Sequence, residues 1–185
     1  MAVNEIRIIM KVIKQKIESL LLQYQPLGYK ETTYAYLYGK APYIAPQAWL
    51  HAVFKPLSAD EIAYVKDNLK NLPDFYEQFL KIYNGFSIFN SALSLYGLRR
   101  NYKRDFDSVW QPYDIFDLNI YDKPGDASGN EFFFAAYNKD GSLVYYNSVA
   151  DKIIKCSADS VAELNTWNSF EDFIIDEIDR LSGEF

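Results

Sequence analysis

Apolar residues near the start of the chain recur at intervals of three and four positions, which places them on one face of a helix. We therefore predict a helix over residues 6–24, ended by Pro26 and Gly28. Its apolar stripe consists of Ile6, Ile9, Met10, Ile13, Ile17, Leu20, Leu21 and Tyr24. Charged side chains interrupt this stretch, so it fits neither a secretory signal nor a membrane span. We expect the helix to pack on its own domain.

Three further helices carry recognisable end signals. Ser58 and Glu61 have the spacing of a capping box, which satisfies two free backbone N–H groups at a helix start. Pro73 suits the first turn of the next helix, and Asn84-Gly85 is predicted to end it. Ser169 is predicted to cap a closing helix whose apolar residues again share one face.

The middle of the chain has the short apolar runs and turn residues of a sheet. Asp140-Gly141 suits a hairpin turn with positive φ. Between residues 27 and 57 we expect a strand over 34–38 and a short helical turn over 49–54, and the pattern leaves open whether this part joins the core or forms a flap. The other strands are predicted over 87–89, 93–96, 115–121, 131–137, 143–146 and 153–156.

The order of elements is helices, then strands, then a closing helix. This order predicts an α+β fold, with a largely antiparallel central sheet flanked by N-terminal helices and a closing C-terminal helix. Residues 1–56 are expected to form a helix and an extension that pack on the same domain as residues 57–185, making one structural unit.

Composition narrows the choice of function. The 185 residues are 49% hydrophobic and 17% aromatic, and the formal net charge of −6 argues against broad contact with nucleic acid. One cysteine and one histidine exclude an internal disulfide and any site that needs two imidazoles. Because Cys156 is unpaired, the expected location is the cytoplasm.

Few residues offer catalytic chemistry. His51 is the only imidazole that could activate Cys156, and a lone cysteine in an apolar run is more often a small buried side chain. The chain has no EF-hand spacing and no glycine-rich nucleotide-binding loop, so we predict no metal and no cofactor. A hydrolytic site built from two carboxylates remains an open alternative, because acidic residues are plentiful and the distance between two carboxyl groups in space decides whether they form such a site.

Candidate partner-binding residues gather between positions 105 and 122. Carboxylates around aromatic side chains suit a basic protein, since charge steers the encounter and aromatics supply buried area. The alternative is a solvated surface whose aromatic side chains point inward. Without other information, the residue types favour this alternative. The adjacent basic run, 99–104, could grip a nucleic acid strand, but its acidic neighbours favour a solvated loop with local ion pairs. The candidates are Asp105, Asp107, Trp110, Tyr113, Asp114, Asp117 and Asp122.

An ordered set of short motifs over residues 57–182 resembles the SUKH superfamily, which includes the yeast Smi/Knr cell-wall regulators and many bacterial immunity proteins. The capped helix is followed by a signature of Leu72, Pro73, Tyr76, Phe79, Leu80, Asn84, Gly85, Tyr96 and Gly97. The later hairpin around Asp140-Gly141 and the helix starting Ser169-Phe170 also match. Nothing in the family pattern accounts for residues 29–54 or for the insert over 99–126.

The resemblance implies a non-enzymatic protein-binding module, because the matching residues pack, start helices or permit turns. It implies an immunity protein that binds and neutralises a cognate bacterial toxin, often a nuclease and therefore basic. It implies no membrane and no direct nucleic acid partner. A regulatory scaffold of the Smi/Knr type is the first alternative, and a carboxylate-dependent hydrolase is the second.

Overall fold

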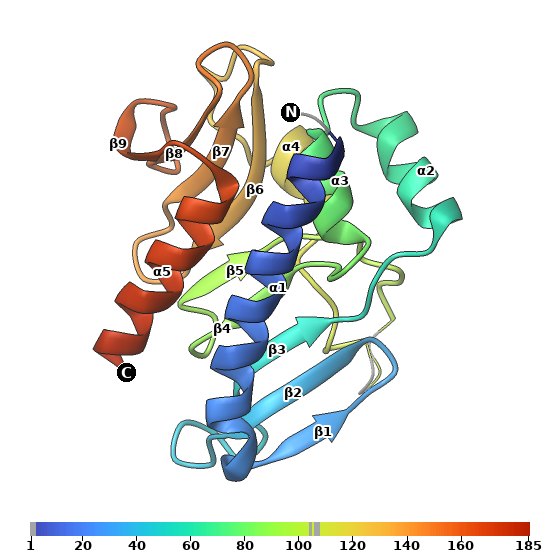
Figure 1. Cartoon of the computed structure of the whole chain (residues 1–185), viewed down its shortest axis with the longest axis vertical. Coiled ribbons are helices and arrows are strands. Elements are labelled where there is room, and N and C mark those ends of the chain that lie inside the picture. Colours follow the sequence, from blue (N-terminus) through green and yellow to red (C-terminus); the bar gives the residue numbers. More distant parts are fainter. Residues whose placement is uncertain (1–2, 104, 106–107) are drawn as a thin grey trace.

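The computed structural model describes residues 3–103, 105 and 108–185, and these residues form an α+β fold (Figure 1). They build five α-helices, a 3-10 turn at Gln25–Leu27 and one nine-stranded antiparallel sheet, which confirms the predicted fold class. The helices are α1 (Val3–Tyr24), α2 (Ala59–Asn68), α3 (Asp74–Leu80), α4 (Ile115–Ile120) and α5 (Phe170–Glu184). The strands are β1 (Tyr29–Glu31), β2 (Ala35–Lys40), β3 (Trp49–Phe54), β4 (Phe86–Ile88), β5 (Leu93–Leu95), β6 (Glu131–Tyr137), β7 (Leu143–Asn147), β8 (Lys152–Cys156) and β9 (Glu163–Trp167).

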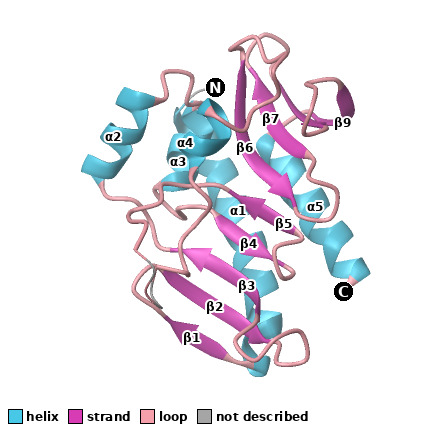
Figure 2. Cartoon of the chain, turned by 180° about the vertical axis from the view of Figure 1, so that it is seen from behind, coloured by secondary structure: helices cyan, strands magenta, loops and turns pink. Residues whose placement is uncertain are grey.

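The strands follow one another through the sheet in chain order, from β1 at one edge to β9 at the other (Figure 2). Helices α1 and α5 lie side by side across one face of the sheet, and α1 also contacts α3 (Figure 1). Successive side chains of β6 point to opposite faces of the sheet. Phe132 and Phe134 belong to the main core with α1, α3 and α5, whereas Phe133 packs with Leu118 of α4 in a smaller cluster.

Residues 27–57 join the central sheet. The predicted strand over 34–38 corresponds to β2, but the predicted helical turn over 49–54 is wrong, because this stretch is the strand β3. Strand β3 pairs with β2 on one side and with β4 on the other, where Val53 lies opposite Phe86. A strand buried on both faces has a continuous apolar run, which does not distinguish it from a buried helix.

The predicted strand over 115–121 is also wrong, because residues Ile115–Ile120 form the helix α4. Asp114 caps this helix, and its carboxylate accepts a hydrogen bond from the Phe116 N–H at 3.0 Å. Asn119 is buried and its side chain bonds to both the N–H and the C=O of Phe133 in β6. This polar residue inside the apolar run therefore serves a tertiary contact.

The two edge strands, β1 and β9, have no counterpart in the predicted elements. Every residue of Tyr29–Glu31 is exposed, and so are most residues of Glu163–Trp167. Without a buried face, neither strand has the alternation of apolar and polar residues that marks a half-buried strand.

The SUKH-like signature lies at the centre of the fold. Tyr76, Phe79 and Leu80 are fully buried on α3, while Leu72 packs against the main core from the preceding loop. The Tyr76 hydroxyl donates a hydrogen bond of 2.6 Å to the Tyr96 carbonyl. Burial raises the pKa of Tyr76 well above its ordinary value, so the phenol stays protonated and can donate. This bond joins α3 to the end of β5.

Pro73 and Asn84-Gly85 differ in detail from the prediction. Pro73 is the N-cap of α3 and precedes its first turn, and α3 ends at Leu80 and not at Asn84-Gly85. Gly85 instead permits a close approach, because it has φ of 84° and a Cβ there would lie 2.4 Å from the Leu95 oxygen. The glycine therefore brings the start of β4 against the end of β5.

Asn84 and Gly97 form a tight contact at the exit from β5. The buried Asn84 amide donates to the Leu98 carbonyl at 2.8 Å and accepts from the Leu98 N–H at 2.7 Å. A Cβ on Gly97 would lie 2.3 Å from both oxygens of Asn84. Only glycine fits here, and the contact fixes where the chain leaves the core for residues 99–113.

Candidate functional site

Six large apolar side chains gather on one exposed region of the molecule, which we call the aromatic surface. They come from α2, from the loop over 99–113 and from α4, and each is between 49% and 76% exposed. Two adjoining hollows, of about 620 and 720 Å³, are lined by these residues and share Arg99, Tyr102 and Asp114. The aromatic surface consists of Tyr64, Tyr102, Val109, Tyr113, Ile120 and Tyr121.

The loop that carries much of this surface is held by a buried glutamine. The Gln111 side-chain oxygen accepts hydrogen bonds from the backbone N–H groups of Arg100 and Asn101, at 2.9 and 3.2 Å. Its amide nitrogen donates to the carbonyls of Asn101 and Ser108, at 3.0 and 3.3 Å. One side chain therefore ties residues 100–101 to Ser108, so the described backbone beside the exposed Tyr102 and Val109 is held by hydrogen bonds.

An ion pair ties the same loop to α2. Arg100 donates to both carboxylate oxygens of Glu61, at 2.6 and 3.3 Å, and Glu61 also completes the predicted capping box with Ser58. Burial alone would raise the pKa of Glu61, but the hydrogen bonds from Arg100 and Ser58 outweigh burial and lower it. Arg99 donates to the carbonyls of Ser108 and Pro112. Arg99 and Arg100 of the basic run are thus engaged within the chain.

The predicted acidic candidates have different surroundings. Asp105 and Asp122 are exposed and Asp117 is partly exposed, whereas Asp107 lies outside the described residues. Asp114 is buried, and its two carboxylate oxygens accept from the Tyr102 hydroxyl and the Phe116 N–H. Its carboxylate therefore offers little to a partner.

Asp117 lies in a region of negative potential. Partial burial, with the charges of Asp114 and Asp122, raises the pKa of Asp117. A positive group placed beside Asp117 would relieve this repulsion, so the acidic side of the aromatic surface favours a basic partner.

The two predicted aromatic candidates also differ. Tyr113 is exposed and stacks at an angle on Tyr96, with ring centroids 5.3 Å apart. Trp110 is half-buried and packs against Ala35, Leu37, Ala52 and Phe54 on the reverse face of the sheet. Trp110 therefore anchors the loop, and Tyr113 is the one that faces solvent.

Only Tyr113 of this surface is among the predicted candidates; the other five residues, Tyr64, Tyr102, Val109, Ile120 and Tyr121, are not. Tyr102 lies inside the basic run over 99–104, which the sequence predicts to be a solvated loop. Tyr64 lies outside the apolar stripe of α2, and that position out of phase is the signal that marks an exposed aromatic residue.

The sole histidine and the sole cysteine do not meet. His51 is in β3 and Cys156 is in β8, five strands further across the sheet, which separates them by on the order of 20 Å. Burial lowers the pKa of His51 to about 4 and raises the pKa of Cys156 to about 11. The cysteine–histidine pairing considered from the sequence is therefore excluded by geometry.

Among the described residues, no group of three or more His, Cys, Asp and Glu side chains is arranged to hold a metal ion. None of the helices in 3–103, 105 and 108–185 combines the length and apolar character needed to cross a membrane.

Comparison with known proteins identifies the family. No curated protein and no solved structure matches the chain. The model of the SMI1 / KNR4 family (SUKH-1) matches residues 56–176, which is more than half of the 185 residues. The match includes the Asn84–Gly97 contact and the whole loop over 99–113, while α1 lies outside it. By this match the chain belongs to the SMI1 / KNR4 family (SUKH-1).

Proposed function

We propose that the protein is a non-enzymatic binding module that acts as an immunity protein, capturing and neutralising a cognate bacterial toxin. The aromatic surface is the proposed contact, and the toxin is proposed to be basic, as many nucleases are. The proposal includes action in the cytoplasm, where the buried thiol of Cys156 stays reduced. Family membership supports the general class of the partner, a protein.

One observation carries the proposal: exposed aromatic side chains lie beside backbone segments, residues 100–101 and Ser108, that Gln111 holds together. Exposed tyrosines lose little conformational entropy on binding and dominate interface energies. Hydrogen bonds already hold these segments, so a partner is spared the cost of ordering them. The carboxylates of Asp105, Asp117 and Asp122 around this surface supply long-range attraction for a positively charged protein.

A hydrolytic role has less support. Such a site needs two carboxylates in one cleft that are available to the substrate. Asp105, Asp114 and Asp117 line the hollow of about 720 Å³. Asp114 accepts from Tyr102 and Phe116, and Asp105 accepts from the Ser108 N–H at 2.8 Å, so two of these three carboxylates are engaged within the chain. A regulatory scaffold of the Smi/Knr type would use the same surface for another protein. Gene neighbourhood separates the two, since an immunity gene stands beside its toxin gene.

The proposal is tested by growth protection. Cells expressing the toxin domain encoded next to this gene are expected to grow when the protein is present and to stop when it is absent. The double variant Tyr113→Ala/Tyr121→Ala removes two anchors of the aromatic surface and is expected to abolish protection. Tyr43→Ala is the matched control, because Tyr43 is 77% exposed on the separate β2–β3 connection.

Co-purification gives a second readout that does not depend on toxicity. The toxin domain is expected to be retained by the wild type and by Tyr43→Ala, and to associate faster at low salt than at high salt. Retention by the double variant at wild-type level would contradict the proposed surface. A neighbouring gene product that neither binds nor is inhibited would contradict the immunity function itself.

A further inference from the structure

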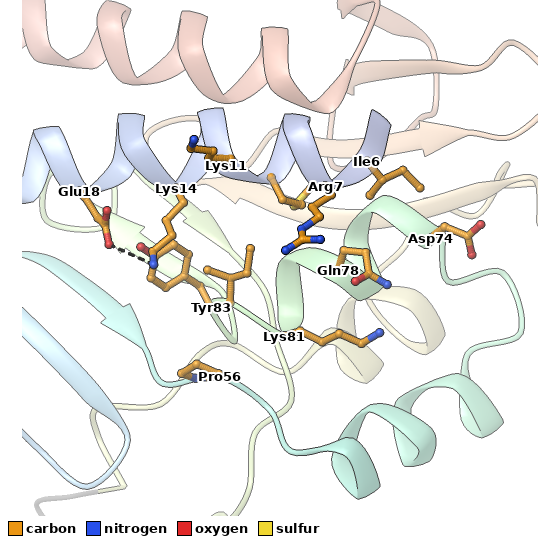
Figure 3. A pocket seen from close by; sticks show the side chains of 12 residues that line it. Ile6, Arg7, Lys11, Lys14, Glu18, Pro56, Asp74, Gln78, Lys81 and Tyr83 are labelled. Carbon is orange, nitrogen blue, oxygen red and sulfur yellow. Dashed lines mark ion pairs between the residues drawn. The ribbon is translucent and has the colours of Figure 1, made fainter. Parts of the chain in front are cut away.

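A third hollow, which shares no lining residue with the two at the aromatic surface, lies between α1 and α3. It has a volume of about 860 Å³ and is the largest described here (Figure 3). We call it the α1–α3 groove. One wall, α1, is outside the family match and the other, α3, is inside it, so the groove combines an element beyond the matched residues with the family core.

The groove is basic although the whole chain is acidic. Four cations line it, Arg7, Lys11 and Lys14 from α1 and Lys81 from the end of α3, against the two anions Glu18 and Asp74. The net charge of its lining is therefore positive, in a chain whose formal net charge is −6.

Two of the four cations are already neutralised within the chain. Lys14 pairs with Glu18 at 3.6 Å, and Lys81 pairs with Glu77 at 2.6 Å. Among the residues that the structure describes, neither Arg7 nor Lys11 forms an ion pair. The Arg7 side chain extends from α1 toward α3 and Gln78 (Figure 3).

The rest of the lining is apolar or offers unused polar groups. Ile6, Met10 and Ile82 supply apolar surface beside the cations. Gln78 and Tyr83 are partly exposed, and within the described part of the chain the amide of Gln78 and the hydroxyl of Tyr83 make no hydrogen bond. An amide that can both donate and accept suits the backbone of a bound peptide.

We propose that the α1–α3 groove docks an acidic, partly apolar peptide segment of a partner protein. Carboxylates of the segment pair with Arg7 and Lys11, and backbone groups bond to Gln78. Apolar side chains lie on the partly exposed Ile82 and on the small exposed edges of Ile6 and Met10. The volume lies in the range of pockets that enclose a short ligand segment. This inference goes beyond the proposed function, because it concerns a different surface and the opposite charge.

A nucleic acid is the disfavoured occupant. Two unpaired cations are few for a phosphate backbone, whose binding draws on many such contacts. An evenly charged backbone would also bring phosphates against Glu18 and Asp74, whereas a peptide can place its carboxylates at Arg7 and Lys11 and uncharged residues elsewhere.

A random library of 12-residue displayed peptides tests the proposal. The library is first depleted on the variant Arg7→Glu/Lys11→Glu and then selected on the wild-type protein, so peptides that bind elsewhere are removed. The recovered peptides are expected to be rich in Asp and Glu with large apolar residues between them. They are expected to bind the double variant at least about tenfold more weakly.

The matched control is Lys139→Glu/Lys152→Glu, which makes the same change in net charge at two exposed lysines, one in the β6–β7 turn and one at the start of β8. Binding to this control is expected to stay within about twofold of wild type. Circular dichroism checks that both variants fold, and Gln78→Ala, which leaves every charge in place, is expected to weaken the same peptides.

The proposal is overturned if the recovered peptides are neutral or basic, if selection yields none, or if both double variants weaken binding equally. It is also overturned if a 12-nucleotide oligothymidylate binds the groove more tightly than the selected peptides. None of these results affects growth protection by the aromatic surface, so the two proposals fail separately.

Discussion

The contact between Asn84 and Gly97 can be tested by adding one methyl group. In Gly97→Ala the new Cβ would lie 2.3 Å from the backbone oxygen and the side-chain oxygen of Asn84. Ordinary carbon–oxygen contacts are about 3.3 Å or longer, so the chain must move by about 1 Å. Asn84 cannot yield freely, because its amide is fully buried and bonded twice to Leu98.

The expected cost follows from what the movement breaks. Inserting a methyl group into a packed site costs about 1–3 kcal/mol. Straining or losing the two buried hydrogen bonds of Asn84 adds about 1–3 kcal/mol. We expect Gly97→Ala to lower the free energy of unfolding by about 3–5 kcal/mol, a large part of the total of about 5–15 kcal/mol for a domain.

Urea unfolding followed by tryptophan fluorescence measures this change. At a slope of about 2 kcal/mol per M, the midpoint should fall by roughly 2 M. Gly125→Ala is the control, because no atom lies within 4 Å of a Cβ at Gly125, and it should change stability by less than about 0.5 kcal/mol.

A double variant isolates the clash. Asn84→Ala deletes the side-chain oxygen that the new methyl group meets, so Gly97→Ala/Asn84→Ala should cost less than the sum of the two single variants. Our reading of this contact is wrong if Gly97→Ala is no more destabilising than Gly125→Ala, or if the two single costs simply add.

Three further predictions concern charge and reactivity. Arg100→Leu is expected to lower the free energy of unfolding by about 1 kcal/mol at neutral pH. Because the pKa of Glu61 is lowered in the folded state, this stabilisation is present above the unfolded pKa of about 4.3 and is lost as pH falls through the folded value. The urea midpoints of wild type and variant should therefore converge in acid, and parallel curves would refute the prediction. Burial lowers the pKa of His51 to about 4, so the free energy of unfolding should fall by roughly 3 kcal/mol as pH falls from about 6.5 to 4. His51→Leu should abolish most of that loss. An equal loss in the variant would show that His51 is not responsible. Cys156 is buried and its pKa is raised to about 11, so Ellman's reagent should label it only in urea; rapid labelling of the native protein would contradict the buried position.

The sequence predicts helix caps and turns correctly where contacts between neighbouring residues alone determine the structure. The capping box of Ser58 and Glu61 forms as expected, and the hairpin around Asp140-Gly141 joins β6 to β7. Both depend on contacts within a few residues, which are visible along the chain.

Tertiary contacts account for the errors. The run over 115–121 is predicted as a strand, but it is a helix in which Asn119 bonds to Phe133 of β6. The run over 49–54 is predicted as a helical turn, but it is strand β3, which pairs with β2 on one side and β4 on the other. In each segment the partner that decides the structure is far away in the chain, so composition alone cannot choose.

The aromatic surface could be located only in part from the sequence. The region between 105 and 122 was identified by its acids and aromatics, and Tyr113 is exposed there. Tyr64 comes from α2, and only the folded chain brings α2 beside α4, where Tyr64 meets Phe116 with ring centroids 5.6 Å apart. A buried carboxylate such as Asp114 has the same appearance in a sequence as an exposed one.

Titration calorimetry of the purified protein with the toxin domain encoded beside it tests the central claim most directly. We predict saturable binding at one toxin per protein, weakened at least about hundredfold by Tyr113→Ala/Tyr121→Ala and unchanged by Tyr43→Ala. Equal affinity for the double variant and the wild type, or turnover of a substrate with no stable complex, would contradict a function based on capture through the aromatic surface.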